Sequence, residues 1–399
     1  MAVKQGYKQT EVGVIPEDWE IVSIGALGLF AKGQGIRKDE ANSGDLPCIR
    51  YGEIYTRHND VIRAFFSWIS EDIAQNSKRL KKGDILFAGS GETKEEIGKC
   101  VAFVGEEEAY AGGDIVILSP NKGASIFLGY LLNAPVVARQ KASKGQGDAV
   151  VHISSSALSS IKIPFPPLRE QQAIAEALSD VDGLISALDA LIAKQRAIKH
   201  GAMQELLTGQ RRLPGFAGEW EVKTLGEVVD FLDGKRKPIK DSDRAKMQGP
   251  YPYYGASGII DYVNDYLFDD NLILLGEDGE NIISRNSRLV FQIVGKVWVN
   301  NHAHVLKPKP ETDVTFLTEY LESLDFAQYN TGTAQPKLNQ KVCSLIPVMF
   351  PPLAEQTAIA QILADMDGAI AALVQKRAKT VALKQGMMQA LLTGQMRLV

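Results

Sequence analysis

Residues 166–213 read PPLREQQAIAEALSDVDGLISALDALIAKQRAIKHGAMQELLTGQRRL, and residues 351–398 read PPLAEQTAIAQILADMDGAIAALVQKRAKTVALKQGMMQALLTGQMRL. The two stretches align without a gap, 185 residues apart, and 29 of their 48 positions are identical. This period is too long for a solenoid repeat. The sequence therefore predicts two copies of one larger module.

Each repeated stretch is predicted to form one long helix. Its two leading prolines suit a helix start, and Gly209 and Gly394 suit a C-terminal cap. From about Glu170 to Leu207 the helix would rise roughly 55 Å at about 1.5 Å per residue. Apolar residues recur at steps of three and four, which is typical of a coiled-coil seam. The predicted seam consists of Ile174, Leu178, Val181, Ile185 and Leu188 in the first copy and Ile359, Leu363, Met366, Ile370 and Leu373 in the second.

The charge pattern indicates how two such helices would pair. In both copies the first half is mostly acidic and the second half mostly basic. This pattern favours antiparallel pairing, because each acidic half then faces a basic half, although ordinary helix patterning would produce it too. Glycines recur inside both helices at Gly183, Gly201, Gly368 and Gly386. Because glycine lowers helix stability, we expect close packing at these positions.

Composition limits the class of protein. The chain has 399 residues, 45% of them hydrophobic and 23% charged, which is typical of globular proteins of two to four domains. No apolar run reaches about 18 residues, and the start has no signal-peptide core, so neither a membrane span nor export is expected. Three scattered cysteines indicate a reducing compartment, the cytoplasm. The net charge of −4 means that any contact with nucleic acid would use local basic loops or partner subunits.

The repeat also includes the region before each helix. Trp19-Glu20 matches Trp220-Glu221, KKGDILFAGSGE matches DDNLILLGEDGE, and AYAGGDIVILSP matches VWVNNHAHVLKP. Short β-branched runs broken by Gly, Asn and Asp predict strands and turns. The predicted fold class is α+β with a pseudo-twofold internal repeat. Its predicted parts are a first domain at 1–165, a spacer helix at 166–213, a second domain at 214–350 and a second spacer helix at 351–399.

The two predicted domains share apolar positions but differ in their polar loops, which suggests that they recognise two different things. Lys and Arg flanked by Gly, Gln, Asn and Tyr can contact phosphates and base edges, although solvated surface loops have the same composition. The candidate DNA-binding residues are Lys32, Gln34, Arg37, Lys38 and Arg50 in the first domain and Lys235, Arg236, Lys237, Tyr254 and Lys337 in the second.

Motifs for catalysis are weak. The segment from Asp84 to Gly91 is similar to a turn that holds S-adenosylmethionine, but a structural turn is the favoured interpretation. Asp84, Glu92 and Lys94 have the spacing of nuclease carboxylates and lysine, and the second copy lacks the pattern. There is no phosphate-binding GxxxxGK[ST] loop. His302 and His304 alternate as on a strand, and a structural role is favoured over metal binding. We therefore expect no catalytic, cofactor-binding or metal-binding residues.

The sequence resembles the specificity subunit of type I restriction-modification systems over nearly its whole length. The resemblance rests on Tyr7-Lys-x-Thr10-Glu-x-Gly13-x-Ile15-Pro16-x-x-Trp19, on Pro-Pro-Leu-x-Glu-Gln and Leu-Leu-Thr-Gly-Gln in both copies, and on Asn301-His302-Ala303-His304. The first copy departs at Gly112-Gly113-Asp114, where the second has Asn300-Asn301-His302, so a role of His302 would not be shared.

This resemblance implies two target-recognition domains that bind the two halves of an asymmetric, bipartite sequence in double-stranded DNA, within DNA methylation and host defence. It also implies that the long helices pack antiparallel and dock two adenine-N6 methyltransferase subunits, which use S-adenosylmethionine. In systems that cleave DNA, two restriction subunits using ATP and Mg²⁺ would join them. Two alternatives stay open: a scaffold that binds only protein, and an enzyme built on Asp84, Glu92 and Lys94.

Overall fold

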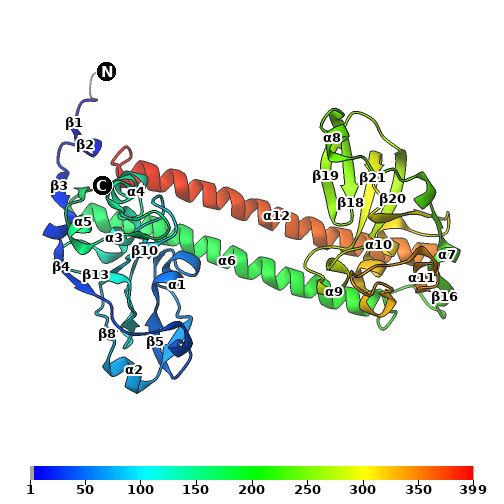
Figure 1. Ribbon diagram of the computed structural model, residues 1–399, viewed down its shortest axis with the longest axis horizontal. Coiled ribbons are helices and arrows are strands. Elements are labelled where there is room, and N and C mark those ends of the chain that lie inside the picture. Colours follow the sequence, from blue (N-terminus) through cyan, green and yellow to red (C-terminus); the bar gives the residue numbers. More distant parts are fainter. Residues whose placement is uncertain (1–3, 399) are drawn as a thin grey trace. The chain divides into compact units, whose positions relative to one another are not determined.

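The computed structural model describes residues 4–398 and divides into two compact units (Figure 1). The first unit comprises residues 1–188 and 376–399, and the second comprises 189–375. The repeated stretches form α6 (Leu168–Leu206) and α12 (Leu353–Leu392), as predicted. Each unit therefore contains the start of one long helix and the end of the other. The predicted domain boundaries follow the sequence repeat, whereas the units divide both helices.

The first unit is built on two sheets. One has the order β4-β13-β9-β11-β6, and the other has the order β7-β5-β12-β8. Their strands are β4 (Gly28–Lys32), β5 (Leu46–Ile49), β6 (Asp60–Val61), β7 (Ser67–Ile69), β8 (Lys78–Arg79), β9 (Ile85–Ala88), β11 (Cys100–Ala102), β12 (Tyr110–Ala111) and β13 (Ile115–Pro120). Three strand pairs complete the unit: β1 (Tyr7–Thr10) with β2 (Gly13–Pro16), β3 (Glu20–Ser23) with β15 (Lys162–Phe165), and β10 (Ser90–Gly91) with β14 (Val151–His152).

The second unit has one six-stranded sheet with the order β17-β22-β20-β21-β18-β19. Its strands are β17 (Val229–Phe231), β18 (Gln248–Gly255), β19 (Gly258–Val263), β20 (Phe268–Gly276), β21 (Val290–Val299) and β22 (Ala303–Pro308), and β16 (Glu221–Thr224) pairs with β23 (Pro347–Phe350). The order β17-β22-β20-β21 repeats the order β4-β13-β9-β11 of the first unit. The repeat seen in the sequence is thus a repeat of sheet topology.

Short helices join these strands. Those of the first unit are η1 (Ile24–Ala26), η2 (Lys38–Glu40), α1 (Tyr51–Thr56), α2 (Glu71–Gln75), α3 (Ser125–Leu131), α4 (Pro135–Lys144) and α5 (Ser155–Ser159). Those of the second unit are α7 (Leu225–Val228), η3 (Asp233–Lys235), α8 (Asp241–Arg244), α9 (Asn281–Ser284), α10 (Val314–Ser323), η4 (Ala327–Tyr329) and α11 (Gln340–Cys343). The helices α3 and α4 are separate, because Pro135 begins a new helix.

The two long helices are antiparallel, and opposite charges meet between them as predicted. In the first unit, Lys384 of α12 contacts Asp182 of α6, with 2.8 Å between Nζ and Oδ1. In the second unit, Lys199 of α6 contacts Asp367 of α12 at 2.7 Å. The basic second half of each helix therefore faces the acidic first half of the other.

The early seam residues are part of the cores of the units. Ile174 and Leu178 of α6 are fully buried in the core of the first unit, where Leu391 and Leu392 of α12 join them. The core of the second unit includes Ile359 and Leu363 of α12, Leu206 at the end of α6, and Leu207 directly after it. Of the remaining predicted seam residues, Leu188 is buried, and Val181, Ile185, Met366, Ile370 and Leu373 are half-buried.

A buried carboxylate ties the two helix ends together in each unit. In the first unit Glu170, which is fully buried, accepts hydrogen bonds from the indole of Trp19 at 2.8 Å and from Arg397 at 2.8 Å. In the second unit Glu355 accepts from Trp220 at 3.0 Å and from Arg212 at 2.7 Å. These six residues are the repeated Trp, Pro-Pro-Leu-x-Glu and Gly-Gln-x-Arg positions of the sequence, so the repeated motifs meet at one point in each unit.

One expectation about the helices is corrected. Among residues 4–398, no atom outside the local helix lies within 4 Å of a Cβ built on Gly183, Gly201, Gly368 or Gly386, so these glycines are not sites of close packing there. Gly209 and Gly394, by contrast, adopt φ of +73° and +70°, as the predicted caps require.

The helix α12 is long and apolar enough to cross a membrane by length and composition alone. Scattered charges interrupt this helix, so its sequence contains no unbroken apolar run of that length. Its two ends pack in the cores of the two units, and Asp367 and Lys384 form ion pairs with α6. The apolar composition is therefore not evidence of a membrane span.

Candidate nucleic-acid interface

Three of the candidate residues of the first unit lie around one hollow. Arg37, Lys38 and Arg50 line a hollow of about 720 Å³ between η2 and the start of α1. Arg50 is held by Glu53 of α1, with 3.3 Å between the guanidinium and the carboxylate. Arg57, which is not among the candidates predicted from the sequence, lines the same hollow and lies over the ring of Phe66. An arginine beside an aromatic residue is a signal that could have identified it.

The other two candidates of the first unit lie apart from this hollow. Lys32 ends β4 and lines a different hollow of about 480 Å³, together with Lys144 of α4. Gln34 is exposed, and its backbone N–H donates to the carbonyl of Ala111. The first unit thus has three clustered candidates and two separate ones.

The candidate residues of the second unit differ in the exposure of their side chains and in the contacts that these side chains make. Lys235 and Lys237 are exposed on the loop that follows β17. Arg236, between them, is largely buried: it contacts Glu277 at 2.6 Å and donates to the carbonyl of Ala303 at 2.7 Å. Tyr254 is half-buried in β18 and packs on the ring of Phe291.

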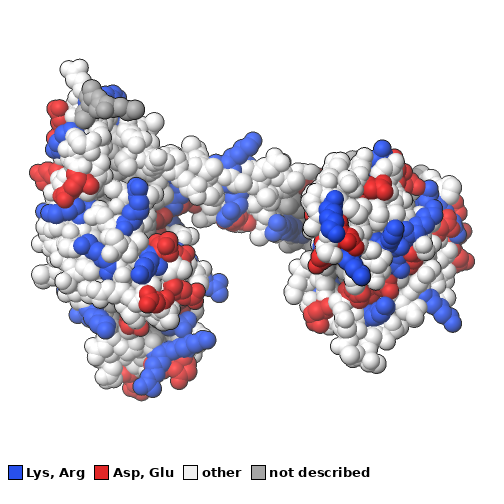
Figure 2. Space-filling view, turned by 45° about the horizontal axis from the view of Figure 1, so that its top comes forward, with Lys and Arg blue, Asp and Glu red and all other residues white. Residues whose placement is uncertain are grey.

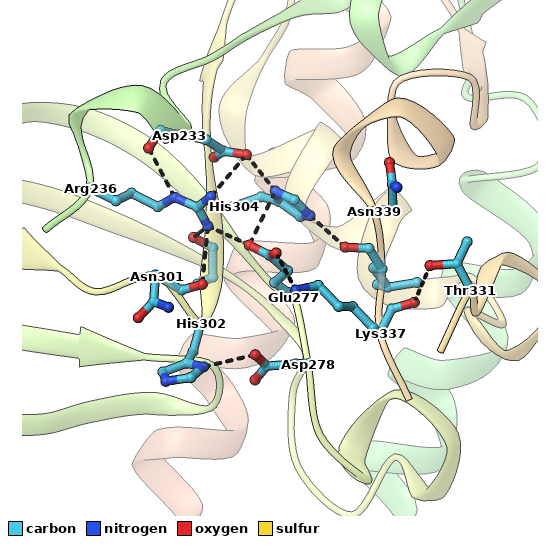
Figure 3. Close-up of polar contacts among 12 residues, drawn as sticks. Asp233, Arg236, Glu277, Asp278, Asn301, His302, His304, Thr331, Lys337 and Asn339 are labelled. Carbon is cyan, nitrogen blue, oxygen red and sulfur yellow. Dashed lines mark hydrogen bonds and ion pairs between the residues drawn. The ribbon is translucent and has the colours of Figure 1, made fainter. Parts of the chain in front are cut away.

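Lys337 joins the same cluster as Arg236. Its ammonium group lies 3.3 Å from Glu277, the carboxylate that Arg236 also contacts. Glu277 follows β20, and its backbone carbonyl accepts from the N–H of Leu338 at 2.7 Å. Two candidates distant in sequence therefore converge on one acidic residue (Figure 3).

His304 belongs to this cluster and is its most deeply buried charged group. Its Nδ1 is 2.6 Å from Asp233, its Nε2 is 3.0 Å from the carbonyl of Leu338, and its side chain is 1% exposed (Figure 3). Burial alone would lower the pKa of His304, but hydrogen bonds and charges of Asp233 and Cys343 raise this pKa to about 10. These contacts agree with the structural role that was favoured for His304. His302, by contrast, lies in a turn and is half exposed beside Asp278.

In the first unit, a hollow lies at the position that corresponds to the His304 cluster. The β-pairing places Ala88 opposite Ile115 in one unit and Gly276 opposite Ala303 in the other, so Gly89 corresponds to Glu277 and Val116 to His304. The strand contact between Ser90 and His152 likewise corresponds to that between Asp278 and Lys337. The hollow of about 480 Å³ in the first unit is lined by Lys32, Gly89, Ser90, Asp114, Val116 and His152. One framework position therefore holds an ion network in one unit and an open hollow in the other.

Asp84, which both weak catalytic motifs include, makes contacts within the fold. Asp84 is buried, and its carboxylate accepts from the backbone N–H of Lys81 at 2.8 Å and from the hydroxyl of Ser119 at 2.6 Å. The Gly-rich segment after it forms the turn between β9 and β10. Among residues 4–398, no group of three or more His, Cys, Asp or Glu side chains could hold a metal ion.

Charge on the surface is mixed. On the face shown in Figure 2, lysine and arginine side chains are interspersed with aspartate and glutamate over both units. This agrees with the net charge of −4. Specific contact with a polyanion would depend on local loops, such as the basic hollow of the first unit.

Taken together, the two related α+β units and their different polar loops define a duplicated recognition protein. The model of the type I restriction modification DNA specificity domain matches residues 16–195 and again residues 217–382. The chain belongs to this family, whose members are non-catalytic specificity subunits of type I restriction-modification systems.

Relatives and solved structures agree with this assignment. The type I restriction enzyme MjaVIII specificity subunit of Methanocaldococcus jannaschii is 25% identical over 434 residues, covering 99% of this chain and 96% of that protein. A Haemophilus influenzae protein described in the same terms is 38% identical over 154 residues, which is 39% of this chain and 38% of that protein.

The fold is also found in the crystal structure of the type I restriction-modification S subunit from M. genitalium. That structure superimposes with a TM-score of 0.62 at 17% identity, covering 98% of both chains. A second structure, from work on complex assembly and conformational transition of the type I restriction-modification system, gives a TM-score of 0.58 at 17% identity, covering 96% of this chain and 99% of that one. At 17% identity, these two comparisons show similarity of fold alone.

Proposed function

We propose that the chain binds an asymmetric, bipartite target in double-stranded DNA, one half-site per unit, within a cytoplasmic complex with methyltransferase subunits. The observation that carries this proposal is one framework with two different sets of loop side chains. If both units bound the same half-site, their loops would match as their strands do. Lys32, Gly89, Val116 and His152 instead stand where the second unit has Asp233, Glu277, His304 and Lys337.

The long helices support the docking of partner subunits. Leu184, Leu191 and Ile198 recur every seven residues along α6, and they are 44%, 39% and 45% exposed. Leu383 of α12 is 58% exposed. Apolar side chains at this spacing on one helix are suited to a partner helix or groove. We propose that two methyltransferase subunits cover these faces and bring the S-adenosylmethionine. In systems that cleave DNA, two restriction subunits would bring ATP and Mg²⁺.

Mapping of methylated adenines in DNA treated with the chain and its methyltransferase partner tests this proposal. We expect one split sequence with two unlike halves and a spacer of constant length. Retention of duplex DNA on filters by the complex provides an independent readout. A protein-only scaffold would give no sequence preference in either experiment, and Mg²⁺-dependent nicking by the chain alone would point to an enzyme.

Replacing Lys235 and Lys237 together with alanine should weaken binding to every duplex by a similar factor. Both side chains are exposed, and a lysine that contacts phosphate contributes affinity without base preference. We expect the slope of log K against log salt to become shallower by about one for each lysine that neutralises a phosphate in the wild type. Lys246→Ala, an exposed lysine paired with Asp243 on the same unit, serves as the matched control. An unchanged salt slope in the double variant would remove these lysines from the interface.

A further inference from the structure

Three loops of the second unit lie around His304. They are the loop 233–237 after β17, the turn 300–302 before β22, and the segment 330–338 before α11 (Figure 3). The first and third contain four of the five candidate DNA-binding residues of this unit. What holds these loops in place therefore bears on DNA recognition.

Both ring nitrogens of His304 donate hydrogen bonds. Nε2 is 3.0 Å from the carbonyl oxygen of Leu338, which can only accept, so Nε2 carries a hydrogen. Nδ1 is 2.6 Å from the carboxylate of Asp233. Burial would raise the pKa of Asp233, but the hydrogen bond from His304 lowers it, so this carboxylate is ionised and Nδ1 donates as well. The side chain is an imidazolium that links the loop 233–237 to the segment 330–338.

The neighbours of His304 complete this link. Asp233 also accepts from the N–H of Val305 at 2.9 Å, which fixes the first loop to β22. Arg236 connects that loop to Glu277 and to the carbonyl of Ala303. Lys337 connects the third segment to Glu277. Arg236 is thus occupied within the unit, whereas Lys235 and Lys237 on either side of it are exposed.

The first unit shows that the framework does not need this network. Val116 takes the place of His304 and Gly89 that of Glu277, and a hollow of about 480 Å³ lies there instead. The strands around it nevertheless keep the same order in both units. The network is consequently tied to the loops of the second unit and not to its sheet.

We propose that His304 is a positioning residue for recognition of the second half-site, and that its imidazolium holds loops 233–237 and 330–338 in the arrangement that contacts DNA. This inference rests on the proposed function. It assigns Arg236 to the same positioning network and leaves Lys235 and Lys237 as the side chains that face the DNA. The first unit would recognise its half-site without such a network.

His304→Gln tests the proposal in the full chain bound to its methyltransferase partner. A photo-crosslinker at Asn301, an exposed residue of the turn 300–302, identifies the half-site that the second unit contacts. Affinity is then measured for duplexes with single base-pair changes in either half-site. We expect discrimination at the second half-site to fall at least tenfold and discrimination at the first to stay unchanged. Amide hydrogen exchange in 330–338 should become at least tenfold faster.

Leu306→Ala is the matched control for plain destabilisation. Leu306 is fully buried in β22, two residues from His304, and its apolar side chain cannot form the hydrogen bonds and ion pairs that hold the three loops. We expect this variant to lower stability and to keep discrimination at both half-sites. If His304→Gln does not assemble, Asp233→Asn removes the same charge pairing and carries the same expectations.

Three results would overturn the proposal: unchanged discrimination in His304→Gln, equal losses at both half-sites, or the same loss in Leu306→Ala. A wild-type complex that shows no bipartite preference would instead overturn the proposed function. The two failures are therefore distinguishable.

Discussion

Replacing Arg397 with methionine should lower the free energy of unfolding of the first unit by about 3 kcal/mol, because an unpaired carboxylate in a protein interior is costly. The carboxylate is that of Glu170, which is fully buried, and Arg397 donates two hydrogen bonds to it. The side chain of Arg397 is 30% exposed, and the indole of Trp19 would still donate, so we expect the lower end of the range for broken buried pairs. Hydrogen exchange of first-unit peptides under increasing urea measures the loss.

Two variants serve as controls for this prediction. Arg79→Met removes a first-unit arginine whose partner, Glu108, is 44% exposed, and such pairs contribute about 0–1 kcal/mol. Asp18→Asn removes the exposed partner of Arg397 and leaves Glu170 paired. A loss in Arg397→Met no larger than that in Arg79→Met would show that the buried carboxylate does not depend on this arginine. Arg212→Met should affect the second unit in the same sense, because Arg212 pairs with Glu355.

The sequence could predict the long helices because each carries its own local signals. Prolines at the start, a period of three and four, and a glycine at the end act within one segment, and the structure confirms both helices and both caps. The antiparallel order was also predictable, because acidic and basic halves are separated along each helix. The prediction of close packing at the internal glycines was wrong, because a glycine in a sequence does not show whether a neighbouring residue approaches it. Among the residues that the structure describes, none approaches these four glycines.

Contacts between distant residues were not predictable in the same way. Glu170 and Arg397 belong to repeated motifs, yet their pairing joins the start of one copy to the end of the other and depends on the tertiary fold. Arg236 has the sequence context of a DNA-contacting loop residue, and only the structure shows Glu277 beside it. The sequence drew attention to His304 because it lies two residues after His302, as side chains on one face of a strand do. No local pattern indicates that Asp233, 71 residues earlier, lies against the ring of His304. Which loop residues contact DNA stays a prediction.

The second large effect expected is a pH dependence of the stability of the second unit. The pKa of His304 is about 10 in the folded protein and about 6.5 in the unfolded chain, so between these values the folded state binds one more proton. This contribution is complete below about pH 6.5 and is lost as the pH rises through about 10. Stability from this group should then fall by about 1.4 kcal/mol per pH unit, or about 2 kcal/mol between pH 7 and 8.5.

The groups around the ring explain why the proton is retained. Asp233 accepts from Nδ1, and Glu277 lies 3.9 Å away on the same side. Arg236 opposes them but is itself shared between these two carboxylates. Cys343 acts in the same direction as Asp233, and the ring of Phe231 packs edge-on against the imidazole. Two carboxylates close to one buried imidazole therefore outweigh the cost of burying its charge.

Urea unfolding followed by hydrogen exchange of second-unit peptides at pH 7.0, 7.75 and 8.5 measures this dependence. The interval lies between about 6.5 and about 10, where the folded state holds one more proton on His304 than the unfolded chain does. His304→Gln has no group that titrates at this position, so its stability should vary with pH by about 2 kcal/mol less than that of the wild type over the same interval. Parallel curves for the two proteins would mean that His304 does not retain its proton in the folded state. In that case the ring would donate from one nitrogen only, and the link between loops 233–237 and 330–338 would be neutral.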